Sequence, residues 1–211
     1  MNKARNYDVP VKIVLFDLGR VLLDWEPDRL YQKLIPDARA RENFLTAICN
    51  MDWHSQHDGG VSFAENAAKL IQEHPDKASL IKAWGERWFE MFDGYIEGVP
   101  ALIDRLEARN IPLFALSNMP SEPWEEMKTH FPYLLRFQDV IVSGDEKCLK
   151  PDEKIYKIAL NRLGHPSADS VLFIDDSPAN IAAAEKLGMQ THLFTSSQGL
   201  ENALIRLNLI G

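Results

Sequence analysis

The sequence is 211 residues long and 45% hydrophobic, so it can bury a sizeable core and has the size of one globular enzyme with room for an inserted module. Its formal net charge of −8 argues against a nucleic-acid partner and allows a small anionic substrate only where local positive charge receives it. No apolar stretch approaches the length needed to span a bilayer, and residues 1–10 lack the apolar segment of a signal peptide.

The first predicted strand covers residues 13–16, an apolar run that ends at Asp17, with Gly19 two positions further on. A carboxylate at such a place is costly to bury unless a cation or hydrogen-bond donors receive its charge. Taken alone, Asp17 can also be an ordinary polar cap on the end of a buried strand.

Residues 23–97 form a segment without a convincing strand, and we predict that it is helical throughout. Because it follows the first strand directly, it would lie over the carboxyl edge of a sheet as a cap that excludes water and selects the substrate. The polar stretch 53–60 is predicted as a loop that either reaches the pocket or simply connects two helices. The four predicted helices of this cap are 28–34, 38–50, 62–73 and 78–92.

The remainder of the chain alternates between short apolar runs and stretches with helical periodicity. This alternation predicts a Rossmann-like α/β fold, in which a parallel sheet carries helices on both faces. The core would consist of residues 1–22 and 98–211, with the cap 23–97 inserted between them. The predicted strands are 111–116, 140–142, 171–174 and 191–194, and the predicted helices are 98–109, 123–130, 152–163, 178–187 and 200–207.

Polar residues follow three of the predicted strands, namely Asp17, Ser117 and the pair Asp175-Asp176. Ligands of such sheets bind beyond the carboxyl ends of the strands, so one pocket can hold all of them. Two adjacent carboxylates repel each other unless positive charge lies between them. The sequence therefore predicts a divalent cation, Mg²⁺, which prefers oxygen ligands and keeps waters for a phosphate substrate.

Four segments in this order resemble the motifs of the haloacid dehalogenase-like (HAD) hydrolases. Each is weak alone, but their order and their places at strand ends make the set specific. The first motif, with the Asp-Trp pair that follows it, is most similar to the family's bacterial sugar-phosphate phosphatases, which include an α-glucose-1-phosphatase. The segments are Phe16-Asp17-Leu18-Gly19-Arg20-Val21, Leu116-Ser117-Asn118, Lys150-Pro151 and Phe173-Ile174-Asp175-Asp176-Ser177.

The resemblance implies that Asp17 is the nucleophile, which would form an aspartyl-phosphate that water then hydrolyses. It implies a Mg²⁺ ion that orients the phosphoryl group of a small phosphorylated metabolite, in this branch a sugar phosphate. The ligands would be a carboxylate oxygen of Asp17, the backbone carbonyl of Gly19, Asp175 and, directly or through water, Asp176.

Ser117 and Asn118 are the candidate donors to the phosphate oxygens, and Lys150 is the candidate cation beside the phosphoryl group. Ser117 and Lys150 would thus complete the catalytic set with Asp17. Arg20, next to the nucleophile loop, is a further candidate for substrate binding. Each has a structural alternative, since Ser and Asn are favoured as helix N-caps and a Lys or Arg in a loop is commonly solvated.

Gly19 departs from the family pattern. The family's phosphatases carry a second Asp two residues after the nucleophile as general acid and base, which is typically worth about 10²–10⁴-fold in rate. Three explanations are open: a substrate with a good leaving group such as a sugar 1-phosphate, a substitute donor such as Asp24 or a cap histidine, or a protein that binds sugar phosphates and turns them over weakly.

The family's dehalogenases offer an alternative activity, in which Asp17 would displace halide from a 2-haloacid without a metal. The pair Asp175-Asp176 argues against it, and the cap contains no convincing Arg for a substrate carboxylate. The two cysteines, Cys49 and Cys148, form no disulfide framework, which favours a reducing, cytoplasmic compartment. No nucleic-acid or membrane partner is expected, and the sequence leaves the oligomeric state open.

Overall fold

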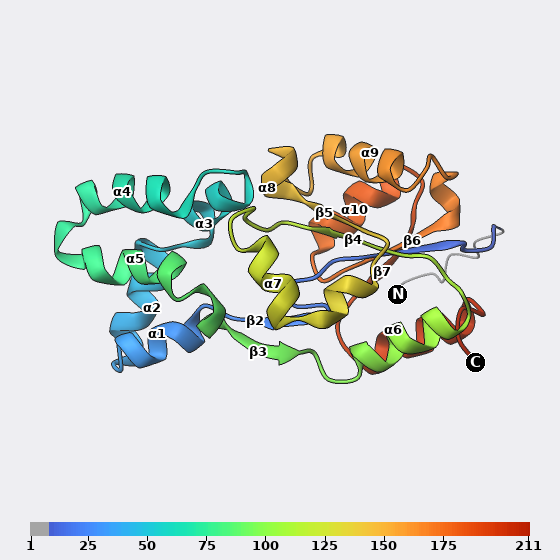
Figure 1. The fold of residues 1–211 in the computed structure, drawn as a ribbon, viewed down its shortest axis with the longest axis horizontal. Coiled ribbons are helices and arrows are strands. Elements are labelled where there is room, and N and C mark those ends of the chain that lie inside the picture. The colour runs from blue at the N-terminus through green and yellow to red at the C-terminus, as the bar shows by residue number, and fades with distance from the viewer. Residues whose placement is uncertain (1–8) are drawn as a thin grey trace.

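A five-stranded parallel sheet forms the centre of the computed structural model, which describes residues 9–211 (Figure 1). The signal-peptide expectation and the start of the predicted core fall partly on residues 1–8 and to that extent lie outside the described residues. The strand order is β5-β4-β1-β6-β7, so the first strand of the chain lies in the middle. The strands are β1 Ile13–Phe16, β4 Leu113–Ser117, β5 Asp139–Val142, β6 Val171–Asp175 and β7 Gln190–Leu193.

Two hydrophobic layers cover the sheet, because successive strand residues face opposite sides. Val14 and Phe16 of β1 belong to one layer, whereas Leu15 between them belongs to the other. The predicted α/β fold, with helices on both faces of a parallel sheet, is confirmed. The helices that supply buried residues to the first layer are α6 Val99–Ala108, α7 Trp124–His130 and α11 Ser197–Arg206, and those of the second are α9 Glu153–Arg162 and α10 Pro178–Lys186.

The insert between β1 and α6 lies at one end of the molecule (Figure 1). It contains five α-helices and a two-stranded sheet, whereas the sequence predicted four helices and no strand. Its own core is rich in aromatic side chains, including the buried Trp84 and Trp88. Its elements are β2 Leu23–Trp25, α1 Asp28–Leu34, α2 Ala38–Ala47, α3 Met51–Asp58, α4 Phe63–Glu73, α5 Ala78–Glu86 and β3 Phe92–Tyr95.

The additional helix arises at Asn50, because its side chain accepts a hydrogen bond from the backbone N–H of Trp53. An asparagine in this position caps a helix N-terminus. The helix predicted for 38–50 therefore ends at Ala47, and a new helix begins at Met51. The stretch 53–60, predicted as a loop, lies mostly within α3, which corrects that prediction.

The two-stranded sheet of β2 and β3 connects the main sheet to the insert, since the chain enters the insert through β2 and leaves it through β3. The two strands are antiparallel, and Leu23 pairs with Tyr95 while Trp25 pairs with Phe92. Neither strand is a continuous apolar run like those of the main sheet, because an Asp interrupts each of them, and this explains why they were not predicted. The helix predicted for 78–92 accordingly ends at Glu86 and is followed by a 3-10 turn before β3.

None of the helices in the described part of the chain is long and apolar enough to cross a membrane.

The short helix α8 and the 3-10 turns that connect the longer helices and strands were not predicted from the sequence. The short elements are α8 Ser143–Glu146 and the 3-10 turns Pro75–Lys77, Trp88–Met91, Pro132–Arg136 and Ala168–Ser170.

Candidate active site

The carboxyl ends of three neighbouring strands bring the predicted site residues together. β1 pairs with both β4 and β6, so Asp17 follows a strand that lies between those ending in Ser117 and Asp175. The predicted convergence at one edge of the sheet is therefore present. It follows from the parallel order of the strands, since their ends must meet at the same edge.

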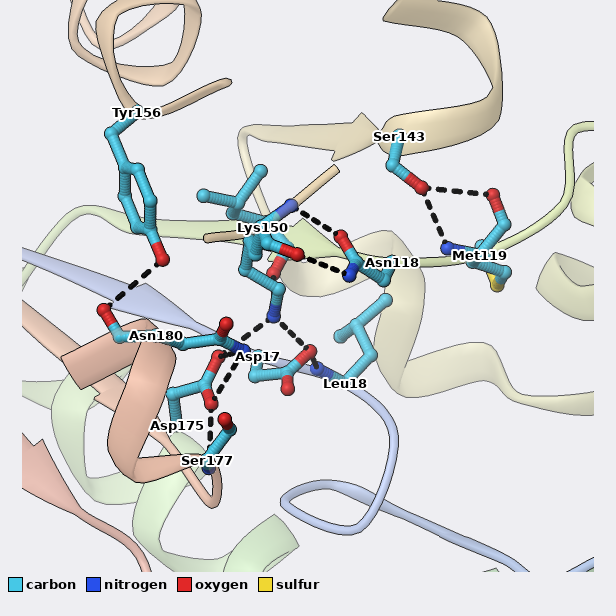
Figure 2. A network of polar contacts seen from close by, with 11 residues as sticks. Asp17, Leu18, Asn118, Met119, Ser143, Lys150, Tyr156, Asp175, Ser177 and Asn180 are labelled. Atoms are coloured by element: carbon cyan, nitrogen blue, oxygen red, sulfur yellow. Dashed lines mark hydrogen bonds and ion pairs between the residues drawn. The ribbon is translucent and has the colours of Figure 1, made fainter. Parts of the chain in front are cut away.

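Lys150 links two of these carboxylates (Figure 2). Its Nζ atom lies 2.8 Å from Oδ1 of Asp17 and 2.7 Å from Oδ2 of Asp175, and it donates to the carbonyl of Leu116 at 3.0 Å. Lys150 is only 5% exposed, which rules out the alternative of a solvated loop lysine. Burial alone would lower the pKa of Lys150, but the carboxylates of Asp17 and Asp175 raise it above its ordinary value.

Asn118 fixes the backbone of Lys150. Its Oδ1 accepts from the backbone N–H of Lys150 at 2.8 Å, and its Nδ2 donates to the carbonyl of Lys150 at 3.0 Å. Both polar atoms of the Asn118 side chain are thus engaged in positioning the lysine, and the next helix begins only at Trp124. The N-cap alternative for Asn118 does not hold, and its contact with a substrate stays a prediction.

Asn180 orients Asp175 and was missed in the sequence analysis. Its Nδ2 donates to both carboxylate oxygens of Asp175, at 3.0 and 3.1 Å, and the backbone N–H of Ser177 donates to Oδ1 at 2.8 Å. The hydroxyl of Tyr156 holds Asn180 in turn by donating to its carbonyl at 3.1 Å. Asn180 lies in the first turn of α10, and an amide so soon after the carboxylate pair is the signal that could have identified it.

The carboxylates outnumber the cations at this place. Oxygen atoms of Asp17, Asp175 and Asp176 lie within 4.8 Å of one another, with the single ammonium of Lys150 between two of them. Burial raises the pKa of Asp17 to about 8 against the opposing charge of Lys150, and burial and the charge of Asp175 raise the pKa of Asp176. Three oxygen donors with excess negative charge fit a hard divalent cation such as Mg²⁺.

A cavity of about 330 Å³ opens above these residues, between the sheet edge and the insert. Ser117 lies in its wall, and the hydroxyl group of this buried residue has no hydrogen-bond partner among residues 9–211. It does not cap a helix, so it remains available to a ligand. The cavity is lined by seven of the eight predicted site residues, with Asp175 beneath them: Asp17, Gly19, Arg20, Ser117, Asn118, Lys150 and Asp176.

Arg20 lines the cavity but already has two partners. Its guanidinium lies 5.6 Å from the ring centre of Trp25 and forms an ion pair with Glu26 at 3.3 Å. About half of the Arg20 side chain is exposed. The structure therefore brings Arg20 to the rim of the cavity, and its contact with a substrate stays a prediction.

The insert contributes residues that the sequence analysis did not identify as site residues. Helix α3 presents His54, Ser55 and Asp58 to the cavity, and the His54 ring stacks against those of Trp25 and Trp88, which also contact each other. His54 and Asp58 share one helical face because they are four residues apart. That spacing is informative only once α3 is known to be a helix.

Comparison with known proteins agrees with this fold. A family model described as haloacid dehalogenase-like hydrolase matches residues 11–188. The sesquiterpene phosphatase astK of Aspergillus oryzae is 24% identical over 183 residues, which cover 84% of this chain and 87% of that protein. An (S)-2-haloacid dehalogenase of Pseudomonas putida is 29% identical over 86 residues, which cover 41% of this chain and 37% of that protein.

Among solved structures, a HAD family enzyme of Bacteroides thetaiotaomicron in complex with magnesium and inorganic phosphate has the same fold. The TM-score is 0.67 with 24% sequence identity, and the match covers 88% of this chain and 95% of that one.

Proposed function

The chain belongs to the haloacid dehalogenase-like hydrolases, and from that premise we propose that it is a Mg²⁺-dependent phosphatase of small phosphomonoesters. The observation that carries the proposal is the buried Lys150 ammonium, held between Asp17 and Asp175 at the floor of the cavity. A site with this ammonium and a cation can receive a phosphoryl group, because both attract its oxygens.

Asp17 acts as the nucleophile in this proposal. Its Oδ1 accepts from Lys150 and from the backbone N–H of Leu18 at 2.7 Å, whereas its Oδ2 has no hydrogen-bond partner among the described residues. One oxygen is therefore held and the other is open to attack phosphorus. The product of that attack is an aspartyl-phosphate, which water hydrolyses to release phosphate.

The cation would be held by Asp17, Asp175 and Asp176, with the backbone carbonyl of Gly19 as a further ligand. When bound, Mg²⁺ supplies orientation of the phosphoryl group and compensation of its negative charge. The similar enzyme from Bacteroides thetaiotaomicron, which was crystallised with magnesium and inorganic phosphate, supports this assignment. Ser117 would donate its free hydroxyl to a phosphate oxygen, and Lys150 would contribute its charge.

Removal of the metal tests this part of the proposal. We expect EDTA to abolish the release of phosphate from 4-nitrophenyl phosphate and added Mg²⁺ to restore it, because the crowded carboxylates repel a phosphate dianion unless a cation is present. The measurement is the rate of phosphate release after dialysis against EDTA, with and without Mg²⁺. Full activity in the chelator would contradict the proposed metal dependence.

The organic part of the substrate is proposed from the cavity wall. The sequence predicts a sugar phosphate, but most of the wall above the phosphate site is apolar or aromatic. Such a wall favours an ester whose alcohol carries an apolar group, and the similarity to a sesquiterpene phosphatase supports the same choice. The apolar residues of the wall include Trp25, Met51, Trp88, Phe92, Met119 and Met127.

A panel of phosphate esters separates the two substrate classes. Burial of about 100 Å² of apolar surface is worth about 2.5 kcal/mol, so we expect farnesyl phosphate to exceed the glucose phosphates roughly 70-fold in kcat/KM. Higher kcat/KM for glucose phosphates would instead favour the sugar-phosphate branch. If the enzyme hydrolyses glucose 1-phosphate faster than glucose 6-phosphate, the leaving-group explanation for Gly19 is supported. Equal kcat values for the two esters would favour a substitute proton donor.

Dehalogenation is the second candidate activity, because part of the chain is similar to an (S)-2-haloacid dehalogenase. The close approach of Asp17, Asp175 and Asp176 speaks against it, since a metal-free site gains nothing from three crowded carboxylates. Release of halide from a 2-haloacid in the presence of EDTA would reverse this preference.

A further inference from the structure

The proposed reaction needs a proton donor for the leaving oxygen, and the position that usually provides it is Gly19. Asp24, the substitute considered from the sequence, is not placed to serve. Its Oδ1 lies 2.7 Å from a guanidinium nitrogen of Arg29, and Asp24 does not line the cavity. The donor must therefore come from another residue of the cavity wall.

Asp58 of the insert contributes a carboxyl group to that wall. It is 6% exposed, and its buried Oδ1 has no hydrogen-bond partner among the described residues. Nε2 of His54 lies 3.4 Å from this Oδ1, beyond the usual length of a hydrogen bond. Nδ1 of His54 is also buried and unpaired in the described part of the chain. Buried polar atoms without partners are destabilising, and a ligand in the cavity that bonds to them would offset this cost.

The backbone of Asp58 is fixed to the sheet domain next to the phosphate site. Its carbonyl accepts from Oγ of Ser143 at 2.7 Å, and the same Oγ accepts from the backbone N–H of Met119 at 2.9 Å (Figure 2 shows the Ser143–Met119 link). Met119 lies two residues after Ser117, so the end of α3 is linked through Ser143 to the loop that follows the phosphate-site serine.

Gly60 confirms how closely this end of the insert approaches the core. A Cβ atom at Gly60 would lie 2.7 Å from the carbonyl oxygen of Gly144, and the backbone has a φ of +95°. Only glycine fits such an approach without strain. The turn after Asp58 therefore packs directly against α8, which holds the backbone at this end of α3 beside the core.

We propose that Asp58 is the general acid and base of this enzyme, so that the insert supplies the proton transfer that Gly19 cannot perform. The inference rests on the proposed phosphatase function. In the first step Asp17 forms a bond to phosphorus, the bond from phosphorus to the alcohol oxygen breaks, and the Asp58 carboxyl proton moves to that oxygen. In the second step water bonds to phosphorus, its proton returns to Asp58, and the bond from phosphorus to Asp17 breaks.

The charge state of Asp58 suits this role. Burial raises its pKa to about 7, and the charge of Lys150 opposes that rise. Burial also lowers the pKa of His54 to about 3, so the imidazole beside Asp58 is neutral and does not hold the carboxyl group in its ionised form. A general acid is most effective when its pKa lies near the working pH.

Asp58→Asn tests the proposal through the leaving-group dependence of kcat/KM. An amide cannot protonate an alkoxide, so we expect kcat/KM for benzyl phosphate to fall about 10²–10⁴-fold. The value for 2,4-dinitrophenyl phosphate should change little, because its leaving group needs no proton. Phosphorylated enzyme should accumulate with this second substrate, since the base for the hydrolysis step is also lost. Asp24→Asn is the matched control and should leave both substrates unaffected.

Gly19→Asp in the Asp58→Asn background gives a gain-of-function test. A Cβ atom at Gly19 meets no atom within 4 Å and its φ is outside the left-handed region, so the backbone there accepts a residue with a side chain. We expect the double variant to recover kcat/KM for benzyl phosphate and not for 2,4-dinitrophenyl phosphate, which had little to regain. A double variant no better than Asp58→Asn would overturn the proposal.

Two further outcomes distinguish the proposed role of Asp58 from the phosphatase function on which that role rests. Equal losses on both substrates, or a selective loss in Asp24→Asn instead, would overturn the role of Asp58 while the phosphatase function stands. A wild-type protein that hydrolyses none of these phosphomonoesters with Mg²⁺ present would overturn the phosphatase function and the role of Asp58 with it.

Discussion

Asp17→Asn is expected to lower kcat on the order of 10⁵–10⁶-fold, the size of effect seen when a catalytic nucleophile is removed. The amide keeps the shape of the side chain but cannot attack phosphorus. The fold should persist, because the strands on both sides of β1 pair through backbone atoms. The measurements are steady-state kinetics on 4-nitrophenyl phosphate and circular dichroism. A kcat near that of the wild type would exclude Asp17 as the nucleophile.

The same substitution should change how stability depends on pH in the metal-free protein. Burial raises the pKa of Asp17 from an ordinary value near 4 to about 8 in the folded state. The folded state therefore holds a proton that the unfolded state has lost between these values, so stability falls as pH rises through this window. In EDTA we expect the melting temperature of Asp17→Asn to fall less than that of the wild type from about pH 5 to about pH 8, and Mg²⁺ should restore more stability to the wild type.

The sheet and its site could be predicted because they depend on local patterns. A buried parallel strand is a short apolar run, and the polar residue after it must lie at the carboxyl edge wherever the strand is placed in the sheet. Asp17, Ser117 and Asp175 were found in this way. The side chains that hold these residues in place could not be predicted from local patterns, because the contact of Asn180 with Asp175 exists only after α10 has packed beside β6.

The insert was harder to predict for physical reasons. The boundary between α2 and α3 depends on one capping side chain, Asn50, and β2 gains its stability from pairing with a strand about 70 residues later in the sequence. The position of Asp58 depends on the contact of α3 with Ser143. None of these appears in a periodicity of apolar residues, so the residues of the insert that face the cavity emerge only from the three-dimensional structure.

Lys150→Met is expected to cause the largest loss of stability of any single change at the site. The substitution leaves the carboxylates of Asp17 and Asp175 buried with no ammonium between them, and removal of one partner of a buried ion pair typically costs about 3–5 kcal/mol. Lys157→Met is the matched control on the following helix, because Lys157 is mostly exposed and pairs with Glu153 at the surface. Its effect should stay within about 1 kcal/mol. The measurement is urea unfolding of both variants and the wild type in EDTA at about pH 9, above the pKa of about 8 of Asp17, so that this carboxyl group is ionised in the wild type.

A double substitution identifies the cause of that loss. If repulsion between unbalanced carboxylates destabilises Lys150→Met, then Asp17→Asn in the same chain removes one of them and should recover part of the free energy of unfolding. Mg²⁺ should recover stability in Lys150→Met as well, because a cation among the three carboxylates replaces the lost positive charge. If Lys150→Met unfolds at the same urea concentration as the wild type in EDTA, the buried ammonium does not balance these carboxylates. Independent, additive effects of the two substitutions would instead mean that the loss comes from packing of the lysine side chain.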